Sequence, residues 1–215
     1  YFRLMAIAIN GSTNVITGVG VGGLPDGIVD ADMLAANAVT SAKLASGAVG
    51  KWTHVNNVSF GSGGSYTFTG IPTDTTALRI GFTDLSSNTG SSGSESYAAL
   101  RLGTSSGLVD SNYETVSSYL EDSYQQVETW SSRAILYPSN YGRSQHVFKG
   151  QIECWKLGNT NRWFIKSQLS RGAGNETHFF MQSSIDIGGA ITQAAIFLNT
   201  GSFDGGSGAI SYYQD

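Results

Sequence analysis

Hydrophobic and polar residues alternate along most of the chain beyond residue 50. Short runs rich in Val, Ile, Phe, Tyr and Trp are separated by clusters of Gly, Asn, Asp and Ser. A period of two is typical of β-strands that bury one face. The pattern predicts strands at 52–60, 66–70, 77–83, 97–102, 134–137, 147–157, 163–169, 177–187, 191–198 and 209–213. Because no segment here shows a helical period, we expect a mainly β fold, an antiparallel, jelly-roll-like β-sandwich.

Earlier in the chain the apolar spacing changes to every fifth residue. A continuous α-helix turns about 100° per residue, so it would scatter these side chains around its circumference. The pattern instead indicates short helical turns, begun by Asp30 or Thr40 as N-caps and ended near Asn37 or Gly47. One chain alone would leave the side chains in water, so we expect several identical chains to bury them along a stalk. The seam residues are Val29, Leu34, Val39, Leu44 and Val49.

The sequence therefore divides into three parts, at 1–27, 28–50 and 51–215. In the first part, two short β-prone runs flank Asn10-Gly11, which is a hairpin signal. This part is too small to bury a core of its own, so we expect it to become ordered against another protein or its own copies. It shows no signal-peptide pattern, and Met5 is a candidate natural start.

Composition and charge exclude several classes of function. The chain has a net charge of −4, and its 12 basic residues form no run, which argues against nucleic-acid binding. No stretch approaches the roughly 18 consecutive apolar residues of a membrane span, so we expect no membrane insertion. The single cysteine, Cys154, excludes an internal disulfide. It shares a strand face with Phe148 and Ile152, which predicts a buried thiol.

The segment Ser111–Arg143 is polar and rich in tyrosine, and we expect it to form long loops with room for one strand pair. Tyr and Trp present broad, stiff faces that stack on sugar rings or fill protein pockets. Two interpretations stay open: the rings form a receptor site, or they pack under their own loops or at a subunit contact. The candidate receptor-binding residues are Tyr113, Tyr119, Glu121, Asp122, Tyr124, Trp130, Tyr141 and Arg143.

No catalytic or metal site is expected. Glycosidases use two carboxylates about 5–9.5 Å apart, whereas the adjacent Glu121 and Asp122 would point to opposite faces of a strand. His54, His146 and His178 are far apart in sequence and lack nearby ligands, so neither a metal nor another cofactor is predicted. A ring of symmetry-related histidines is the alternative that would bind one.

Blocks of sequence follow one another in a distinctive order. The first runs from Ile9-Asn-Gly-Ser-Thr-Asn through Gly22-Gly-Leu-Pro-Asp-Gly into Val39-Thr-Ser-Ala-Lys-Leu-Ala. Those of the body are Tyr66-Thr-Phe-Thr-Gly-Ile-Pro, Leu78-Arg-Ile-Gly-Phe-Thr-Asp-Leu-Ser, Leu100-Arg-Leu-Gly, Gly158-Asn-Thr-Asn-Arg-Trp, Ile191-Thr-Gln-Ala-Ala-Ile-Phe-Leu, Phe203-Asp-Gly-Gly and Ile210-Ser-Tyr-Tyr. With these blocks, most of the chain resembles bacteriophage tail or virion fibre proteins.

The resemblance implies a homotrimer located in the virion. Residues 5–27 would dock on other virion proteins of the tail or capsid, 28–50 would form a trimeric stalk, and 51–215 would be a knob that contacts a glycan or protein of the host surface. It carries over no catalytic residue, and 111–143 is longer and more aromatic than the usual connection of the family. The alternatives are a purely architectural head fibre or decoration protein without a specific receptor, and a small glycan-processing enzyme.

Overall fold

The computed structural model describes residues 8–10, 15–17, 51–89, 96–121, 124–142, 146–172 and 177–214. The chain forms two compact units, Tyr1–Ser46 and Gly47–Asp215. In the first unit, β1 (Ala8–Asn10) pairs antiparallel with β2 (Val15–Thr17), as the hairpin signal at Asn10-Gly11 predicted. The predicted stalk with its seam residues lies outside the described residues and stays a prediction. Those residues are Val29, Leu34, Val39, Leu44 and Val49.

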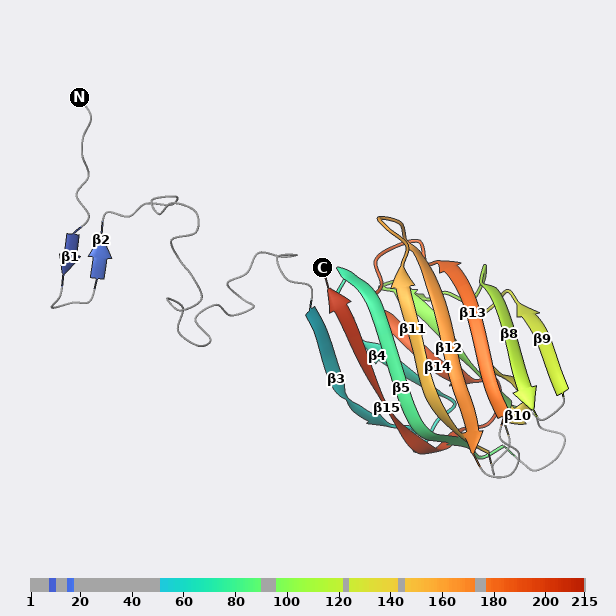
Figure 1. Cartoon of the computed structure of the whole chain (residues 1–215). Coiled ribbons are helices and arrows are strands. Elements are labelled where there is room, and N and C mark those ends of the chain that lie inside the picture. The colour runs from blue at the N-terminus through green and yellow to red at the C-terminus, as the bar shows by residue number, and fades with distance from the viewer. Residues whose placement is uncertain are drawn as a thin grey trace. The chain divides into compact units, whose positions relative to one another are not determined.

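The second unit contains two antiparallel sheets that face each other (Figure 1). The larger has eight strands, in the spatial order β3 (Lys51–Ser59), β15 (Phe203–Gln214), β5 (Thr75–Ser87), β11 (Val147–Lys156), β12 (Arg162–Gly172), β13 (Thr177–Asp186), β8 (Glu114–Glu121) and β9 (Tyr124–Trp130). The smaller has five, in the order β10 (Ala134–Gly142), β6 (Ser96–Thr104), β14 (Gln193–Leu198) and β4 (Ser65–Thr69), with β7 (Gly107–Leu108) beside β6. Among the described residues there is no helix that could cross a membrane.

The core lies between the inner faces of the two sheets. On β12 every second side chain is buried, as at Trp163, Ile165 and Leu169, and the residues between them face outward. From the smaller sheet, Leu100 and Ile196 join the same core. Burying one such side chain stabilises the fold by about 1.5–3 kcal/mol, so the alternation fixes which face of each strand points inward.

Aromatic packing and the cysteine mark the centre of this core. Tyr137 of β10 stacks on Phe148 of β11 with ring centroids 4.0 Å apart, which ties the two sheets together. Cys154 is fully buried, as predicted from its position on the face of Phe148 and Ile152. Burial raises the pKa of the Cys154 thiol because it disfavours the charged thiolate.

All ten strands predicted from the alternation are present, and the β11–β12 hairpin turns at Gly158-Asn-Thr-Asn161 as expected. The expectation of long loops is wrong for most of Ser111–Arg143: the segment contains the strand pair that was allowed for, β8 and β9, and the strand predicted at 134–137, β10. Eight and five strands in two unequal sheets also depart from the eight-stranded jelly roll. The basic architecture, two facing antiparallel sheets, is as predicted.

Strand β8 was missed because its polarity is inverted. Its inward side chains include Thr115 and Ser117, whereas Val116 and Leu120 point to solvent and are each 49% exposed. The buried hydroxyl of Thr115 is within hydrogen-bond distance of the Ser183 hydroxyl (2.6 Å) on the adjacent strand β13. A buried polar group is tolerated when it is hydrogen-bonded, so the usual apolar-inward signal is absent here.

Candidate functional site

Two of the residues predicted to form a receptor site lie in the core. Tyr113 is 2% exposed, and its hydroxyl oxygen accepts a hydrogen bond from the backbone N–H of Leu102 (2.9 Å). Burial raises the pKa of the Tyr113 hydroxyl. Tyr119 is 4% exposed and donates its hydroxyl to the Gln126 side-chain oxygen (2.6 Å). For these two rings the receptor-site interpretation is therefore wrong, and the alternative, that they pack within the protein, applies.

The other predicted residues are not brought together as a described site. Trp130 is half-buried and packs on Tyr97, with ring centroids 5.8 Å apart, at the smaller hydrophobic cluster. Its role is at least partly structural. The side chains of Glu121, Tyr124 and Tyr141 lie outside the description, as do Asp122 and Arg143 altogether, so their part in binding stays a prediction.

The structure instead reveals a row of aromatic side chains on the outer face of the larger sheet. Across successive strands, Trp52 of β3 lies opposite Tyr213, Tyr213 opposite Ala77, Ala77 opposite Trp155, and Trp155 opposite Phe164 of β12. Directly opposite residues share one face of a sheet. Trp52 is 45% exposed, and the other three rings are half-buried. We call these four rings the aromatic row.

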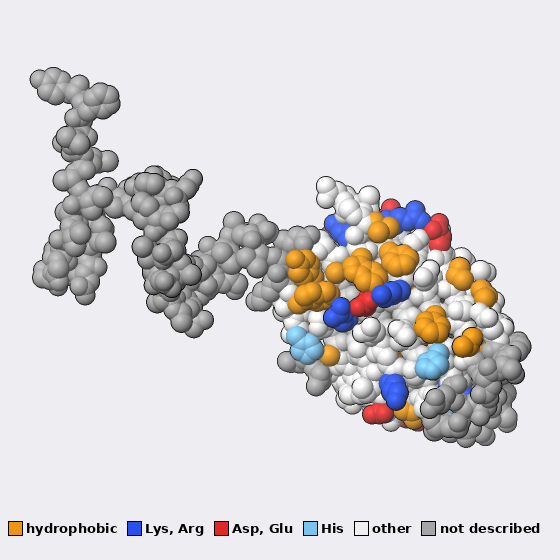
Figure 2. Space-filling model, viewed as in Figure 1, with side chains coloured by type: hydrophobic (Ala, Val, Ile, Leu, Met, Phe, Trp, Pro, Cys, Tyr) orange, Lys and Arg blue, Asp and Glu red, His pale blue; other side chains and the backbone are white. Residues whose placement is uncertain are grey.

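The aromatic row consists of two pairs with a gap between them. The centroids of Trp52 and Tyr213 are 5.6 Å apart, and those of Trp155 and Phe164 are 6.0 Å apart. Between the pairs lies Ala77, whose methyl group is too small to continue the row. Neighbouring strands are about 4.8 Å apart, and β5, which carries Ala77, lies between the two pairs. Each pair is therefore a separate apolar platform, and one extended ligand could contact both. Figure 2 shows hydrophobic side chains gathered on this face.

A row of charged side chains runs directly beside the aromatic row. On β11, the Glu153 carboxylate forms ion pairs with Arg79 Nη2 of β5 (3.0 Å) and Lys166 Nζ of β12 (2.9 Å). The Arg79 guanidinium also lies over the Trp52 ring (5.1 Å to the centroid), and Lys166 Nζ lies over the Trp155 ring (5.0 Å). In Figure 2 the charged row is seen as blue, red and blue groups next to the hydrophobic ones.

The two cations determine the ionisation of Glu153 and the charge of this surface. The hydrogen bond from Lys166, followed by the charges of Lys166 and Arg79, holds the pKa of the Glu153 carboxyl below its usual value. Glu153 is therefore ionised at neutral pH. Two cations and one carboxylate leave a local charge of +1 on a chain whose net charge is −4.

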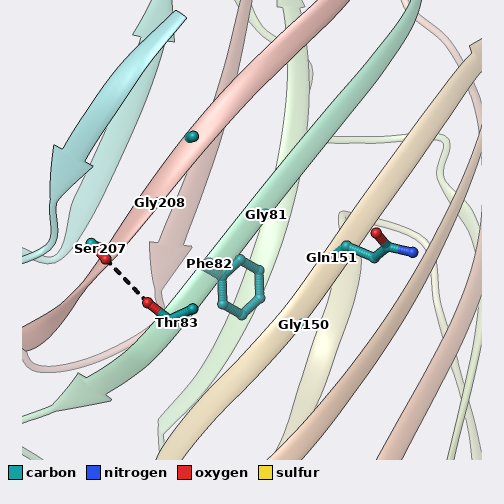
Figure 3. A pocket seen from close by; sticks show the side chains of 8 residues that line it. Gly81, Phe82, Thr83, Gly150, Gln151, Ser207 and Gly208 are labelled. Carbon is teal, nitrogen blue, oxygen red and sulfur yellow. Dashed lines mark hydrogen bonds between the residues drawn. The ribbon is translucent and has the colours of Figure 1, made fainter. Parts of the chain in front are cut away.

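A trough of about 540 Å³ continues this face on the other side of the charged row. It is shallow because Gly81 and Ala209, which lie opposite each other on β5 and β15, have little or no side chain. Polar groups line it: the hydroxyls of Thr83 and Ser207 are 3.1 Å apart, and Gln151 extends from β11 (Figure 3). The trough is thus an open depression with glycine and alanine at its centre, two hydroxyls on one side and a cationic strip on the other.

The packing of the sheet does not require a glycine at position 81. A Cβ added to Gly81 would meet no atom within 4 Å, and its φ is not in the left-handed region. On the neighbouring strand, by contrast, a Cβ at Gly208 would lie 2.6 Å from Cε2 of Phe60. A glycine inside a strand weakens it and often marks a place where a ligand approaches the backbone. Gly81 therefore points to a binding role for the trough.

One signal in the sequence could have located the aromatic row. Cys154-Trp155 and Trp163-Phe164 are adjacent large apolar residues that interrupt the alternation on β11 and β12. Because successive residues of a strand point to opposite faces, one member of each pair must face outward. The remaining rings, Trp52 and Tyr213, could not be assigned to the same row without the pairing of β3 with β15.

The histidines are separated in the structure. His54 is exposed and within hydrogen-bond distance of the Ser211 hydroxyl (3.0 Å), His178 is exposed on β13, and His146 is buried near Phe148. In the part of the chain that the structure describes, no three His, Cys, Asp or Glu side chains come together as metal ligands. The arrangement of rings, cations and hydroxyls is suited to binding a ligand by stacking and hydrogen bonds.

Comparisons with known proteins give little further information. The sequence matches no protein-family model and no curated protein sequence. Among solved structures, the chain is similar to the CBM2 module of the evolved Dit protein of Lactobacillus casei BL23 phage J-1. The identity is 11%, the match covers 70% of this chain and 69% of that chain, and the TM-score is 0.31. A likeness of this size does not assign a function.

Proposed function

We propose that this chain is a bacteriophage fibre protein whose β-sandwich attaches the particle to a glycan of the host surface. The observation that carries the proposal is the aromatic row, four partly exposed rings in register across one sheet face. Apolar side chains that gather on one face, here as two ring pairs, mark interaction sites more than singly scattered ones do. The blocks of sequence that resemble phage fibre proteins supply the biological setting.

A glycan fits this surface better than a deep-pocket ligand does. A sugar ring has apolar C–H faces that stack on aromatic rings and hydroxyls that exchange hydrogen bonds with polar neighbours. Here Arg79 and Lys166 each lie over one face of the Trp52 and Trp155 rings, so a sugar would pack against the rest of each ring and hydrogen-bond to these cations. The face is open and extends across several strands, which suits a polymer lying on the surface.

The rest of the fibre proposal is supported by sequence pattern. Residues 5–27 would dock on the virion, and the five-residue spacing over 28–50 would bring three chains into one stalk. Three identical sites on a rigid trimer raise the apparent affinity well above that of one site, by up to about 10²–10⁴ when the geometry permits. We propose binding without catalysis, since the carboxylate at the site, Glu153, is held between two cations.

The test uses the full chain and a panel of bacterial surface polysaccharides, with binding measured by biolayer interferometry. The double variant Trp52→Ala/Trp155→Ala should lose binding, because it removes the largest ring of each pair. Phe180→Ala is the matched control, since Phe180 is 43% exposed on the same sheet face but lies away from the row. Equal losses in both variants, or no loss in either, would contradict the proposal.

A second exposed cluster favours the alternative of an architectural virion protein. Around Ser118 on the same face, four apolar side chains are 43–59% exposed: Val116, Leu120, Val127 and Phe180. Such a cluster suits contact with another protein. If the chain binds no polysaccharide, and particles that carry Phe180→Ala lose stability while still adsorbing to cells, the architectural function replaces the adhesive one.

A further inference from the structure

We propose that the aromatic and charged rows together bind a sugar that carries a carboxylate, so that the ligand is an acidic polysaccharide. The inference rests on the proposed function and narrows its ligand from glycans in general to one chemical class. It is carried by the geometry of three side chains, Arg79, Glu153 and Lys166, and by their placement against the tryptophan rings.

The first step concerns which charges a ligand would meet. The Glu153 side chain is only 12% exposed, whereas those of Arg79 and Lys166 are 52% and 50% exposed. The carboxylate is therefore covered by its own partners, and the cations form the outer surface. An approaching ligand meets two positive groups rather than a neutral ion-pair network.

The second step concerns donors and charge. Arg79 contacts Glu153 through Nη2, and an arginine has five N–H donors. Lys166 has three donors and contacts the second carboxylate oxygen. Because one carboxylate cannot neutralise two cations, one positive charge is left, and it matches the single negative charge of a sugar carboxylate. A phosphate monoester would bring about −1.5 to −2 and exceed it, whereas a phosphodiester also carries a single charge and is therefore compared directly in the test.

The third step concerns preorganisation. Arg79 is held between Glu153 and the face of Trp52, and Lys166 between Glu153 and the face of Trp155. A cation over an aromatic ring is attracted by the ring's quadrupole. Both long side chains are therefore restrained before a ligand arrives, which lowers the entropy lost on binding. A sugar that packs against the uncovered part of either ring pair would place its substituents at one of these cations.

The fourth step concerns the length of the ligand. The trough at Gly81 begins where the charged row ends, since Arg79 and Gly81 are two residues apart on β5, as are Glu153 and Gln151 on β11. A sugar adjoining the acidic one would therefore reach the hydroxyls of Thr83 and Ser207. Together the platforms, the cations and the trough accommodate several consecutive sugars of one chain.

The test compares three uronate polymers, polygalacturonate, alginate and hyaluronate, with carboxyl-reduced preparations of the same polymers. Using the full chain, we expect binding to at least one native polymer and binding at least about tenfold weaker to its reduced form. Arg79→Gln and Lys166→Gln should each weaken binding of the acidic polymer about threefold to tenfold, since each removes a charged hydrogen-bonding group. Both residues are half-exposed, so the variants should fold. Arg133→Gln, which removes a cation that lies over the Tyr97 ring of β6 in the smaller sheet, is the control.

The results separate this inference from the proposed function. Equal binding of native and reduced polymers, no binding to any uronate polymer, or tighter binding to poly(glycerol phosphate) overturns the acidic-sugar inference. If a neutral polysaccharide is then bound and Trp52→Ala/Trp155→Ala abolishes that binding, the proposed function stands without the inference. If no polysaccharide of any kind is bound, the proposed function fails as well.

Discussion

Replacing Gly81 with threonine should stabilise the protein and weaken glycan binding at the same time. Gly81 lies in β5, a central strand that pairs with β15 on one side and β11 on the other. A Cβ at this position would meet nothing within 4 Å. Its backbone is not left-handed, so a threonine can be accommodated without strain. Its side chain would occupy the floor of the trough.

The expected magnitudes follow from this geometry. Removing a glycine from a strand interior gains about 0.5–1 kcal/mol, mainly by reducing the freedom of the unfolded chain. A β-branched side chain adds a preference for the extended backbone. We expect the free energy of unfolding to rise by about 1 kcal/mol, which corresponds to about 2–4 °C in Tm for a domain of 150–250 residues. Glycan affinity should fall about tenfold, or 1.4 kcal/mol.

Urea unfolding followed by tryptophan fluorescence gives the stability, and biolayer interferometry on the polysaccharide identified in the panel gives the affinity. Gly208→Ala is the contrasting control, because its Cβ would lie 2.6 Å from Phe60 Cε2 and 3.1 Å from the Gly81 carbonyl oxygen. Overpacking of this kind costs about 1–3 kcal/mol. A destabilised Gly81→Thr would refute the account of the strand, and a stabilised variant with full affinity would refute the account of the trough.

Three further predictions concern the core and the charged row. Tyr113→Phe should destabilise the protein by about 1–3 kcal/mol in urea unfolding, because the buried Leu102 N–H loses its acceptor, and it should leave glycan binding unchanged. Glu153→Gln should reduce the free energy of unfolding at pH 7, because the folded-state pKa of Glu153 is lower than its unfolded value of 4.5. This contribution is fully present above pH 4.5 and is lost as the pH falls through the folded-state pKa. In urea titrations, the difference between variant and wild type should therefore shrink below pH 4.5. Iodoacetamide should label Cys154 only in denaturant, because the thiol is fully buried and its pKa is raised; rapid labelling of the native protein, read by mass spectrometry, would contradict its placement.

Period-two alternation was sufficient to predict the strands of the core. It succeeded where one face is apolar and the other polar, as on β12 and β13. It failed on β8, where the hydrogen-bonded hydroxyl of Thr115 and the side chain of Ser117 face inward and Val116 faces outward. An alternation of polarity shows which residues share a face of a strand. It does not show which face is buried when both faces carry polar as well as apolar side chains.

The candidate site was harder to predict than the fold, because it is assembled from residues far apart in the sequence. Trp52 and Tyr213 belong to the two ends of the second unit and become neighbours only through the pairing of β3 with β15. The tyrosines of 111–143 attracted attention because they are close in sequence, yet Tyr113 and Tyr119 turn inward. A high number of aromatic residues in one stretch of sequence therefore shows neither whether their side chains are exposed nor which residues they lie opposite in a sheet.

The pairing of Lys51 with Gln214 places the start of β3 at the same end of the larger sheet as the aromatic row. In a fibre anchored through its N-terminal part, a pull on the particle would enter the head at Lys51, one residue before Trp52. A ligand held at Trp52 would take up the tension one residue from that point, and the load would act on the first hydrogen bonds between β3 and β15. A ligand held at Trp155 or Phe164 would instead pass the load across β15, β5 and β11.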